Sequence, residues 1–208
     1  MKTGVSTLSL AMVACSLAVV TARAADDPND PAAPHEPGLY YYSEAGGEKK
    51  MTKIDPTSYG KTKQGFAFFG VYGQQTKQKA VIEGGHASLQ VVERRPTFYF
   101  YFGSASAGLG ENANLSPDEY VLSLMDVKDS GKSRRLVVGK SGFYGGKSGA
   151  DKHAVRNFAS EKIAPGGFKA TVEQDLADGE YCFFRPIAGA GTIFDFGVKS
   201  SEPVAKKK

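Results

Sequence analysis

The segment from Gly139 to Gly149 holds the residue types of a phosphate-binding loop, in which glycine amides and a lysine surround a phosphate group. Residues 146–148 read Gly-Lys-Ser, which is how that motif ends. The motif also needs a glycine five positions before this tripeptide, where the chain has Ser141, and a helix after it, for which no pattern is present. We therefore predict a flexible loop between two strands, in which Lys140 and Lys147 can contact an acidic ligand.

The hexapeptide Thr97 to Phe102 alternates phenylalanine with tyrosine and has the composition of a strand. Because successive side chains of a strand point to opposite faces, we expect its phenylalanines in the core and Tyr99 and Tyr101 on the other face. Such a tyrosine face can stack on sugar rings, and the run Tyr40 to Tyr42 can extend it. The alternative is that both faces are covered, as in central strands of a sandwich, and the lack of Trp in the chain favours it.

Residues for nucleophilic or metal chemistry are scattered along the chain. No two of the histidines His35, His86 and His153 have the spacing of metal ligands. Cys182 with His153 is an arithmetically possible nucleophile and base, but a thiol between aromatic residues of a strand is typical of a buried cysteine. We therefore predict no catalytic residue, no metal site and no cofactor.

Asp195 stands between two phenylalanines in an otherwise apolar strand. It can point to solvent on the alternate face of that strand. The other interpretations are a cation ligand or a structural carboxylate that is held by hydrogen bonds.

The first 24 residues predict a cleaved export signal. Lys2 precedes an apolar run from Val5 to Val20, and Ala22-Arg23-Ala24 supplies small residues before a cut at Ala25. A retained membrane anchor and an acylated Cys15 are the alternatives, but the run is diluted by serine and threonine and the residues before Cys15 match the acylation motif poorly. We therefore predict a periplasmic or secreted protein that meets the membrane only through an uncleaved signal.

The two ends of the mature chain differ in composition from its middle. Residues 25–38 carry prolines at a strict spacing of three, which is the polyproline II period, and we predict an extended, solvated spacer. A docking peptide for an aromatic groove is the alternative. Residues 200–208 end in three lysines and predict a solvated basic tail.

Charge and cysteine content exclude some classes of protein. Removal of residues 1–24 takes away Lys2 and Arg23 and no acidic residue, so the formal net charge falls from +4 to +2. This is too weak to indicate a nucleic-acid partner. Cys182 is then the one remaining cysteine, so no intramolecular disulfide can form and apolar packing must stabilise the fold.

Residues 39–199 read as one domain of short extended runs separated by Gly, Pro, Asp and Ser, with almost no helical periodicity. The runs are four to eight residues long, mostly β-branched or aromatic, and are expected at residues 39–42, 51–54, 66–72, 79–82, 88–92, 97–102, 120–127, 134–138, 154–158, 168–172, 181–187 and 193–198. This pattern predicts an all-β fold, an antiparallel β-sandwich of immunoglobulin-like or jelly-roll-like type with Greek-key connections.

Three local patterns add detail to this fold. Asp129-Ser130-Gly131-Lys132 predicts the tip of a β-hairpin, because Gly131 can take a positive φ. Ser116 before Pro117 predicts a capped helical turn. Tyr181, at a strand start after an Asp-Gly pair, predicts a tyrosine corner, in which the hydroxyl bonds to upstream backbone.

The sequence resembles a group of exported bacterial proteins of unknown function. The similarity spans roughly residues 36–199 and is carried by residues 96–101, 116–120, 164–168, 178–181 and 194–198. The resemblance implies an origin in the bacterial envelope and a β-rich fold. It implies no activity and no catalytic residue.

Two functions are compatible with these patterns. The first is a non-enzymatic binding or interaction module of the bacterial envelope, with an envelope protein or a polysaccharide as its partner and Tyr99, Tyr101, Lys140 and Lys147 as candidate binding residues. The second is a periplasmic hydrolase or metal-dependent enzyme, whose site is assembled from loops at one end of the sandwich. A buried carboxylate or histidine in a pocket favours the enzyme.

Overall fold

The fold consists almost entirely of short strands. The computed structural model describes residues 27–59, 62–64, 76–103, 116–142, 145–186 and 191–199, of which 62–64, 76–77, 129, 140–142 and 145–148 are described by their backbone alone. The strands are β1 (Gly38–Ala45), β2 (Glu48–Ile54), β3 (Pro56–Tyr59), β4 (Thr62–Gln64), β5 (Thr76–Glu83), β6 (Gln90–Val91), β7 (Thr97–Tyr101), β8 (Val121–Lys128), β9 (Ser133–Gly142), β10 (Gly145–Ser148), β11 (Val155–Arg156), β12 (Phe158–Ala164), β13 (Gly167–Val172), β14 (Gly179–Phe184) and β15 (Gly191–Val198).

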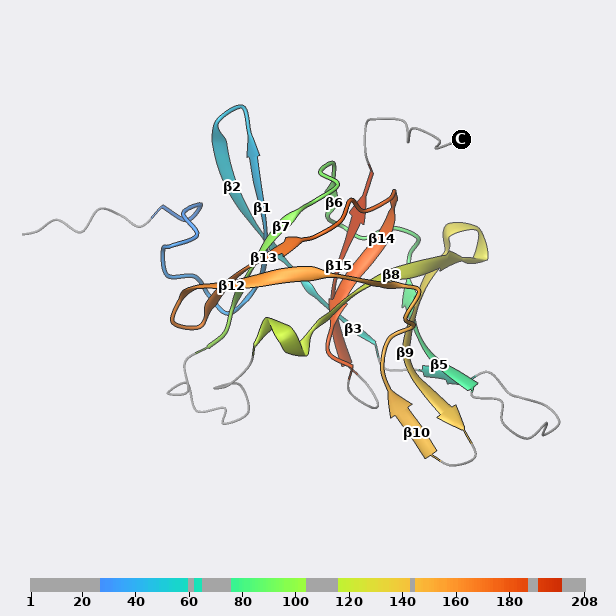
Figure 1. Ribbon diagram of the computed structural model, residues 1–208. Helices are drawn as coiled ribbons and strands as arrows, with labels where there is room; N and C mark the ends of the chain where they lie inside the picture. Colours follow the sequence, from blue (N-terminus) through green and yellow to red (C-terminus); the bar gives the residue numbers. More distant parts are fainter. Residues whose placement is uncertain are drawn as a thin grey trace, which may run out of the picture.

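These strands form two sheets that pack face to face, so the predicted all-β antiparallel sandwich is confirmed (Figure 1). The smaller sheet has the order β12-β13-β7-β1-β2. The larger sheet has the order β3-β15-β14-β8-β9-β5-β4, with β10 beside β9, β11 beside β8 and β6 beside β15. Among the strands that the structure describes, all pairings are antiparallel except that of β15 with β6. The consecutive pairs that form hairpins are β1/β2, β4/β5, β8/β9, β9/β10, β12/β13 and β14/β15, and between them the chain crosses repeatedly from one sheet to the other.

The first hydrophobic core lies between the two sheets. Phe98 and Phe100 of β7 face it, together with Tyr181, Phe183 and Phe196 of the larger sheet. The Phe98 and Phe183 rings meet edge to face at 5.1 Å, the arrangement that aromatic quadrupoles prefer. The phenylalanine face predicted from the alternation of residues 97–102 is therefore a core face.

A second core lies on the opposite face of β14. Cys182 and Phe184 alternate with the residues of the first core and pack there against Ile193, Leu136 and Tyr59. Strand β14 is thus buried on both faces, which accounts for its run of consecutive apolar residues. Cys182 is fully buried, as predicted for this thiol.

The three local predictions are confirmed. Strands β8 and β9 form a hairpin in which Lys128 pairs with Ser133, and Ser130 and Gly131 at its tip have φ of 55° and 86°. The turn η2 (Pro117–Glu119) is capped by the Ser116 side chain. The Tyr181 hydroxyl donates to the Ala177 carbonyl at 2.8 Å, which is the hydrogen bond of a tyrosine corner.

Two predictions made from composition differ from the structure. Residues 139–142 and 145–148, predicted as part of a flexible loop, extend β9 and pair with it as β10, because their backbone amides find partners across the ladder. The proline-rich segment, predicted as a solvated spacer, makes two successive turns from Asp27 to Ala33 and contacts the smaller sheet. The predicted signal of residues 1–24, the predicted strand at 66–72 and the tail of residues 200–208 lie outside the described residues.

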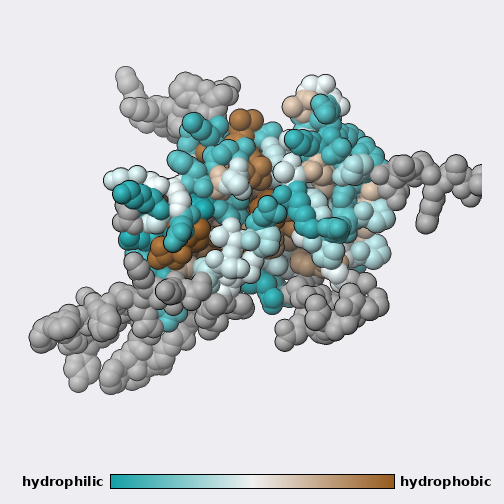
Figure 2. All heavy atoms as spheres, turned by 180° about the vertical axis from the view of Figure 1, so that it is seen from behind, coloured by the Kyte–Doolittle hydropathy of each residue, from teal (hydrophilic) through white to brown (hydrophobic). Residues whose placement is uncertain are grey.

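The surface of the described part of the chain is mainly polar. The face seen in Figure 2 is largely hydrophilic, with hydrophobic side chains in small patches among the charged and polar ones. The exposed large hydrophobic residues are Val92, Val127 and Ile163, which lie on separate strands or connections. Among the described residues, no helix has the length and apolarity needed to cross a membrane.

Candidate functional site

The outer side of the smaller sheet carries a cluster of tyrosines that we call the tyrosine face: Tyr40 and Tyr42 of β1 with Tyr99 and Tyr101 of β7. Register brings them together, since Tyr40 pairs with Tyr99 directly across the two strands. Tyr41 does not join them, because it points into the first core. Tyr99 and Tyr101 are only 7% and 8% exposed, so the expectation that both faces of β7 are covered fits better than an open sugar platform.

The cover is supplied by residues 27–37, which we call the arm. The Tyr101 hydroxyl donates to the Pro31 carbonyl at 2.8 Å, and the Tyr40 hydroxyl donates to the Glu36 carbonyl at 3.1 Å. The His35 ring lies 4.5 Å from the Tyr101 ring and 5.3 Å from the Tyr40 ring. Two features that the sequence shows separately, a proline-rich segment and a tyrosine face, therefore bind each other within one chain.

A second cluster is formed by lysines at the end of the larger sheet, and we call it the lysine face: Lys63, Lys77, Lys79, Lys140 and Lys147. Lys140 of β9 stands directly opposite Lys77 of β5 on one side and Lys147 of β10 on the other. Lys63 of β4 stands opposite Lys79 of β5, two positions along from Lys77. The backbone register therefore places these five lysine positions next to one another at this end of the sheet.

On β5, Ala80 and Ile82 are buried in the second core, whereas Lys79, the residue before Ala80, is only partly buried. None of residues 62–64, 76–79, 139–142 and 145–148 is acidic; apart from lysine they are Thr, Gln, Ser and Gly. Like charges placed directly opposite each other destabilise a sheet by a few tenths of a kcal/mol or more, which an anion across the row would offset.

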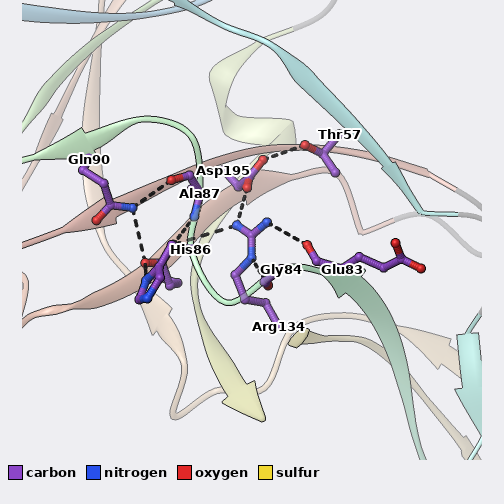
Figure 3. A network of polar contacts seen from close by, with 9 residues as sticks. Thr57, Glu83, Gly84, His86, Ala87, Gln90, Arg134 and Asp195 are labelled. Carbon is purple, nitrogen blue, oxygen red and sulfur yellow. Dashed lines mark hydrogen bonds and ion pairs between the residues drawn. The ribbon is translucent and has the colours of Figure 1, made fainter. Parts of the chain in front are cut away.

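A third group of residues is a buried network of ionised side chains (Figure 3). Arg134 of β9, 4% exposed, lies between two carboxylates of strands further along the larger sheet, Asp195 of β15 and Glu180 of β14. The Nη1 atom of Arg134 donates to Asp195 and lies 3.8 Å from Glu180 Oε2. Asp195 also accepts from the Thr57 hydroxyl at 2.8 Å. Asp195 is therefore a structural carboxylate held by hydrogen bonds, one of the interpretations open from the sequence.

The network fastens the connection between β5 and β6 to the larger sheet. Arg134 Nε donates to the Gly84 carbonyl at 3.1 Å, and the Ala87 amide donates to Glu180 Oε2 at 2.7 Å. His86 Nδ1 lies 3.0 Å from Glu180 Oε1 while its side chain is 78% exposed. Because a carboxylate oxygen only accepts, Nδ1 is the donor in this contact.

Burial raises the pKa of two members of the tyrosine face and of the one described thiol. Desolvation raises the pKa of Tyr101 and, to a smaller extent, of Tyr99, with neighbouring tyrosines adding to the effect. Desolvation, followed by the charge of Asp195, raises the pKa of Cys182. His153 is exposed whereas Cys182 is fully buried, so the two do not form a nucleophile and its base. Within the described residues, no group of three or more His, Cys, Asp or Glu is placed to hold a metal ion.

The structure thus pairs the candidate binding residues but keeps the two pairs apart. Tyr99 and Tyr101 lie in the smaller sheet under the arm, and Lys140 and Lys147 pair at one end of the larger sheet, on opposite sides of the molecule in Figure 1. Sequence reasoning missed Lys77 and Lys79, although their spacing of two within a polar run is a strand signal. It also missed the network of Arg134 and Glu180, whose members are far apart in the chain.

Comparisons with family models, with curated proteins and with solved structures found no match to this chain.

Proposed function

We propose that this protein is a non-enzymatic binding module of the bacterial envelope and that it binds an acidic polysaccharide across the lysine face. The observation that carries the proposal is the register of β5, β9 and β10, which aligns Lys77, Lys140 and Lys147 in one row. Neighbouring strands are about 4.8 Å apart, so the row presents cationic positions at intervals suited to a polymer with repeated carboxylates. The export pattern of the first 24 residues supports a location where such polymers occur.

The residues around the lysines indicate that the polymer carrying the negative charges is a carbohydrate. The paired segments supply Thr, Gln, Ser and Gly, whose hydroxyl, amide and main-chain groups can bond to sugar hydroxyls. The lysines stand out against a chain of nearly balanced charge, with 26 basic and 22 acidic residues overall. Binding therefore depends on where these cations are placed, since net charge alone supplies little attraction.

A titration with polygalacturonate, with dextran as the neutral polymer, tests the proposal. The triple variant Lys77→Gln, Lys140→Gln, Lys147→Gln should weaken binding at least about tenfold, equivalent to about 1.4 kcal/mol. The matched control Lys152→Gln, Lys162→Gln, Lys199→Gln removes the same charge from exposed positions elsewhere and should change affinity by less than about threefold. Binding should weaken as salt is added, because exposed charges are screened.

Three results would contradict the proposal. One is equal loss of affinity in both triple variants, which would mean that only net charge matters. Another is equal binding of dextran and polygalacturonate. The third is lysine-dependent binding to anionic lipid vesicles or to duplex DNA in the absence of binding to polygalacturonate.

The alternative of a periplasmic hydrolase retains one supporting observation. Glu180 contacts Nδ1 of the His86 ring, whose side chain is 78% exposed, and a carboxylate in this position can orient an imidazole to act as a general base. The other contacts of Glu180, to Ala87 and Gln90, are the contacts of a loop anchor. We therefore give the binding function first place.

A further inference from the structure

The edge of the smaller sheet at β2 is covered by side chains of the arm rather than by another strand. Among the described strands, β2 pairs only with β1. The outward amide of Met51 donates to Asn29 Oδ1 of the arm at 3.0 Å. Residues two apart in a strand present their amides to the same edge, so the amides of Lys49 and Lys53 face this edge too. An edge with amides of this kind is a template for pairing with another chain.

Charge selects what can pair with this edge. Strand β2 carries Lys49, Lys50 and Lys53, whereas the arm carries Asp27, Asp30 and Glu36. Lys53 Nζ lies 2.9 Å from Glu36 Oε2. Antiparallel pairing of two copies of β2 about Met51 would place Lys49 of one copy opposite Lys53 of the other, and like charges directly opposite are destabilising. The edge therefore rejects a second copy and favours an acidic chain.

The arm is held more weakly than the strands beneath it. It belongs to no sheet, and its internal backbone hydrogen bonds are those of two turns, from Asp30 to Asp27 and from Ala33 to Asp30. Its ion pair involves side chains that are 40% and 82% exposed, and such exposed pairs contribute little. A segment with few buried contacts opens at a lower free energy than the core of the domain.

We propose that the β2 edge and the tyrosine face together form a docking site for an acidic, proline-containing segment of a partner protein, and that the arm occupies this site in the free protein. The contacts of the arm define what the partner supplies: main-chain carbonyls for the Tyr101 and Tyr40 hydroxyls, a side-chain oxygen for the Met51 amide and a carboxylate for Lys53. The partner segment displaces the arm. This site is separate from the lysine face and does not rest on the polysaccharide proposal.

The test uses the full chain and a labelled synthetic peptide with the sequence of residues 26–37, monitored by fluorescence anisotropy. The variant Asn29→Ala, Glu36→Gln weakens the arm and leaves the docking site intact. Because apparent affinity scales with the fraction of molecules whose site is open, it should bind the peptide several-fold to about tenfold more tightly than the unmodified chain. Adding Lys53→Gln and Tyr101→Phe to this variant should reverse the gain.

Controls separate this proposal from other effects. A peptide in which Asn replaces each Asp and Gln replaces the Glu should bind about tenfold more weakly. The substitution Lys162→Gln, on the edge strand β12, should leave the affinity for the peptide unchanged. The triple variant of Lys77, Lys140 and Lys147 should bind the peptide with unchanged affinity, whether or not its affinity for polygalacturonate falls. The proposal is overturned if the arm-weakened variant, folded by circular dichroism, does not bind millimolar peptide, or if Lys53→Gln with Tyr101→Phe has no effect on binding.

Discussion

At the scale of single residues, Arg134 is the side chain on which most buried charge depends. It is the cation between Asp195 and Glu180, whose side chains are 7% and 5% exposed. Replacing it with methionine keeps the volume but leaves two carboxylates without their cation in a desolvated site. We expect Arg134→Met to lower the free energy of unfolding by about 3–5 kcal/mol, measured by urea denaturation.

A matched control is available in Arg95, whose ion pair with Asp175 joins side chains that are 61% and 57% exposed. Arg95→Gln should cost less than about 1 kcal/mol, because exposed pairs are solvated and screened. Equal urea midpoints for the Arg134→Met variant and the unmodified protein would show that the network does not stabilise the fold.

Cys182 gives a second prediction at this scale. Burial raises the pKa of its thiol, and the thiolate is the reactive form, so the native protein should not react with a thiol reagent at neutral pH. Labelling should follow unfolding in urea. Cys182→Ser should cost about 1–3 kcal/mol, since a hydroxyl is placed in an apolar core, and should leave polygalacturonate binding unchanged. Rapid labelling of the folded protein would contradict this expectation.

At the scale of elements, the connection between β5 and β6 packs closely on the hairpin tip between β8 and β9. A Cβ atom at Gly85 would lie 2.1 Å from the Gly131 carbonyl oxygen, which is backbone and cannot move aside without shifting the hairpin. We expect Gly85→Ala to destabilise the protein by about 1–3 kcal/mol in urea. Gly103→Ala is the control, because a Cβ there meets its nearest atom at an ordinary 3.6 Å. Similar costs at both positions would argue against close packing at Gly85.

Elements whose signals are local could be predicted from the sequence. The alternation of residues 97–102 fixed the two faces of β7, Gly131 marked a hairpin tip, and the Asp-Gly pair before Tyr181 marked a tyrosine corner. What could not be predicted depends on pairing between distant segments. Glycine-rich residues 145–148 look like a loop until β9 supplies partners for their amides.

The candidate sites show the same division. Lys140 and Lys147 were identifiable as cations in a polar segment, but their alignment with Lys77 follows from a register between strands that are about 60 residues apart in the chain. The contact of the arm with Tyr101 joins residues 70 positions apart. Hydrophobic periodicity carries no information about such pairings, because it is the same whichever strand lies alongside.

At the scale of the whole molecule, the sandwich separates two surfaces of different chemistry. The lysine face lies at the end of the larger sheet, and the arm lies beside β1 and β2 of the smaller one, on opposite sides of Figure 1. The strands that carry the two surfaces also contribute to the cores, β7 to the first and β5 to the second. The two proposed sites therefore do not overlap, and each can be tested independently of the other.

The buried phenols predict how stability responds to alkaline pH. Desolvation raises the pKa of Tyr41, Tyr99, Tyr101 and Tyr181 in the folded state above the ordinary value of about 10. Above pH 10 the unfolded chain therefore binds fewer protons than the folded one, and the free energy of unfolding falls as the pH rises. The contribution of each phenol is fully present below pH 10 and is lost as the pH rises through the folded-state pKa.

Urea denaturation at pH 8, 9, 10 and 11 measures this loss, and Tyr101→Phe isolates one phenol. Each tyrosine that stays protonated only in the folded state contributes a slope of about 1.4 kcal/mol per pH unit, so the variant should lose less stability than the unmodified protein between pH 10 and 11, by up to that amount. Tyr42→Phe is the control, because this phenol lies at the margin of the tyrosine face and its hydroxyl bond to Glu44 is exposed. Its pH dependence should stay closer to that of the unmodified protein. Parallel pH profiles for the Tyr101→Phe variant and the unmodified protein would mean that the Tyr101 hydroxyl ionises as readily when folded as when unfolded, and that the arm does not shield it from water.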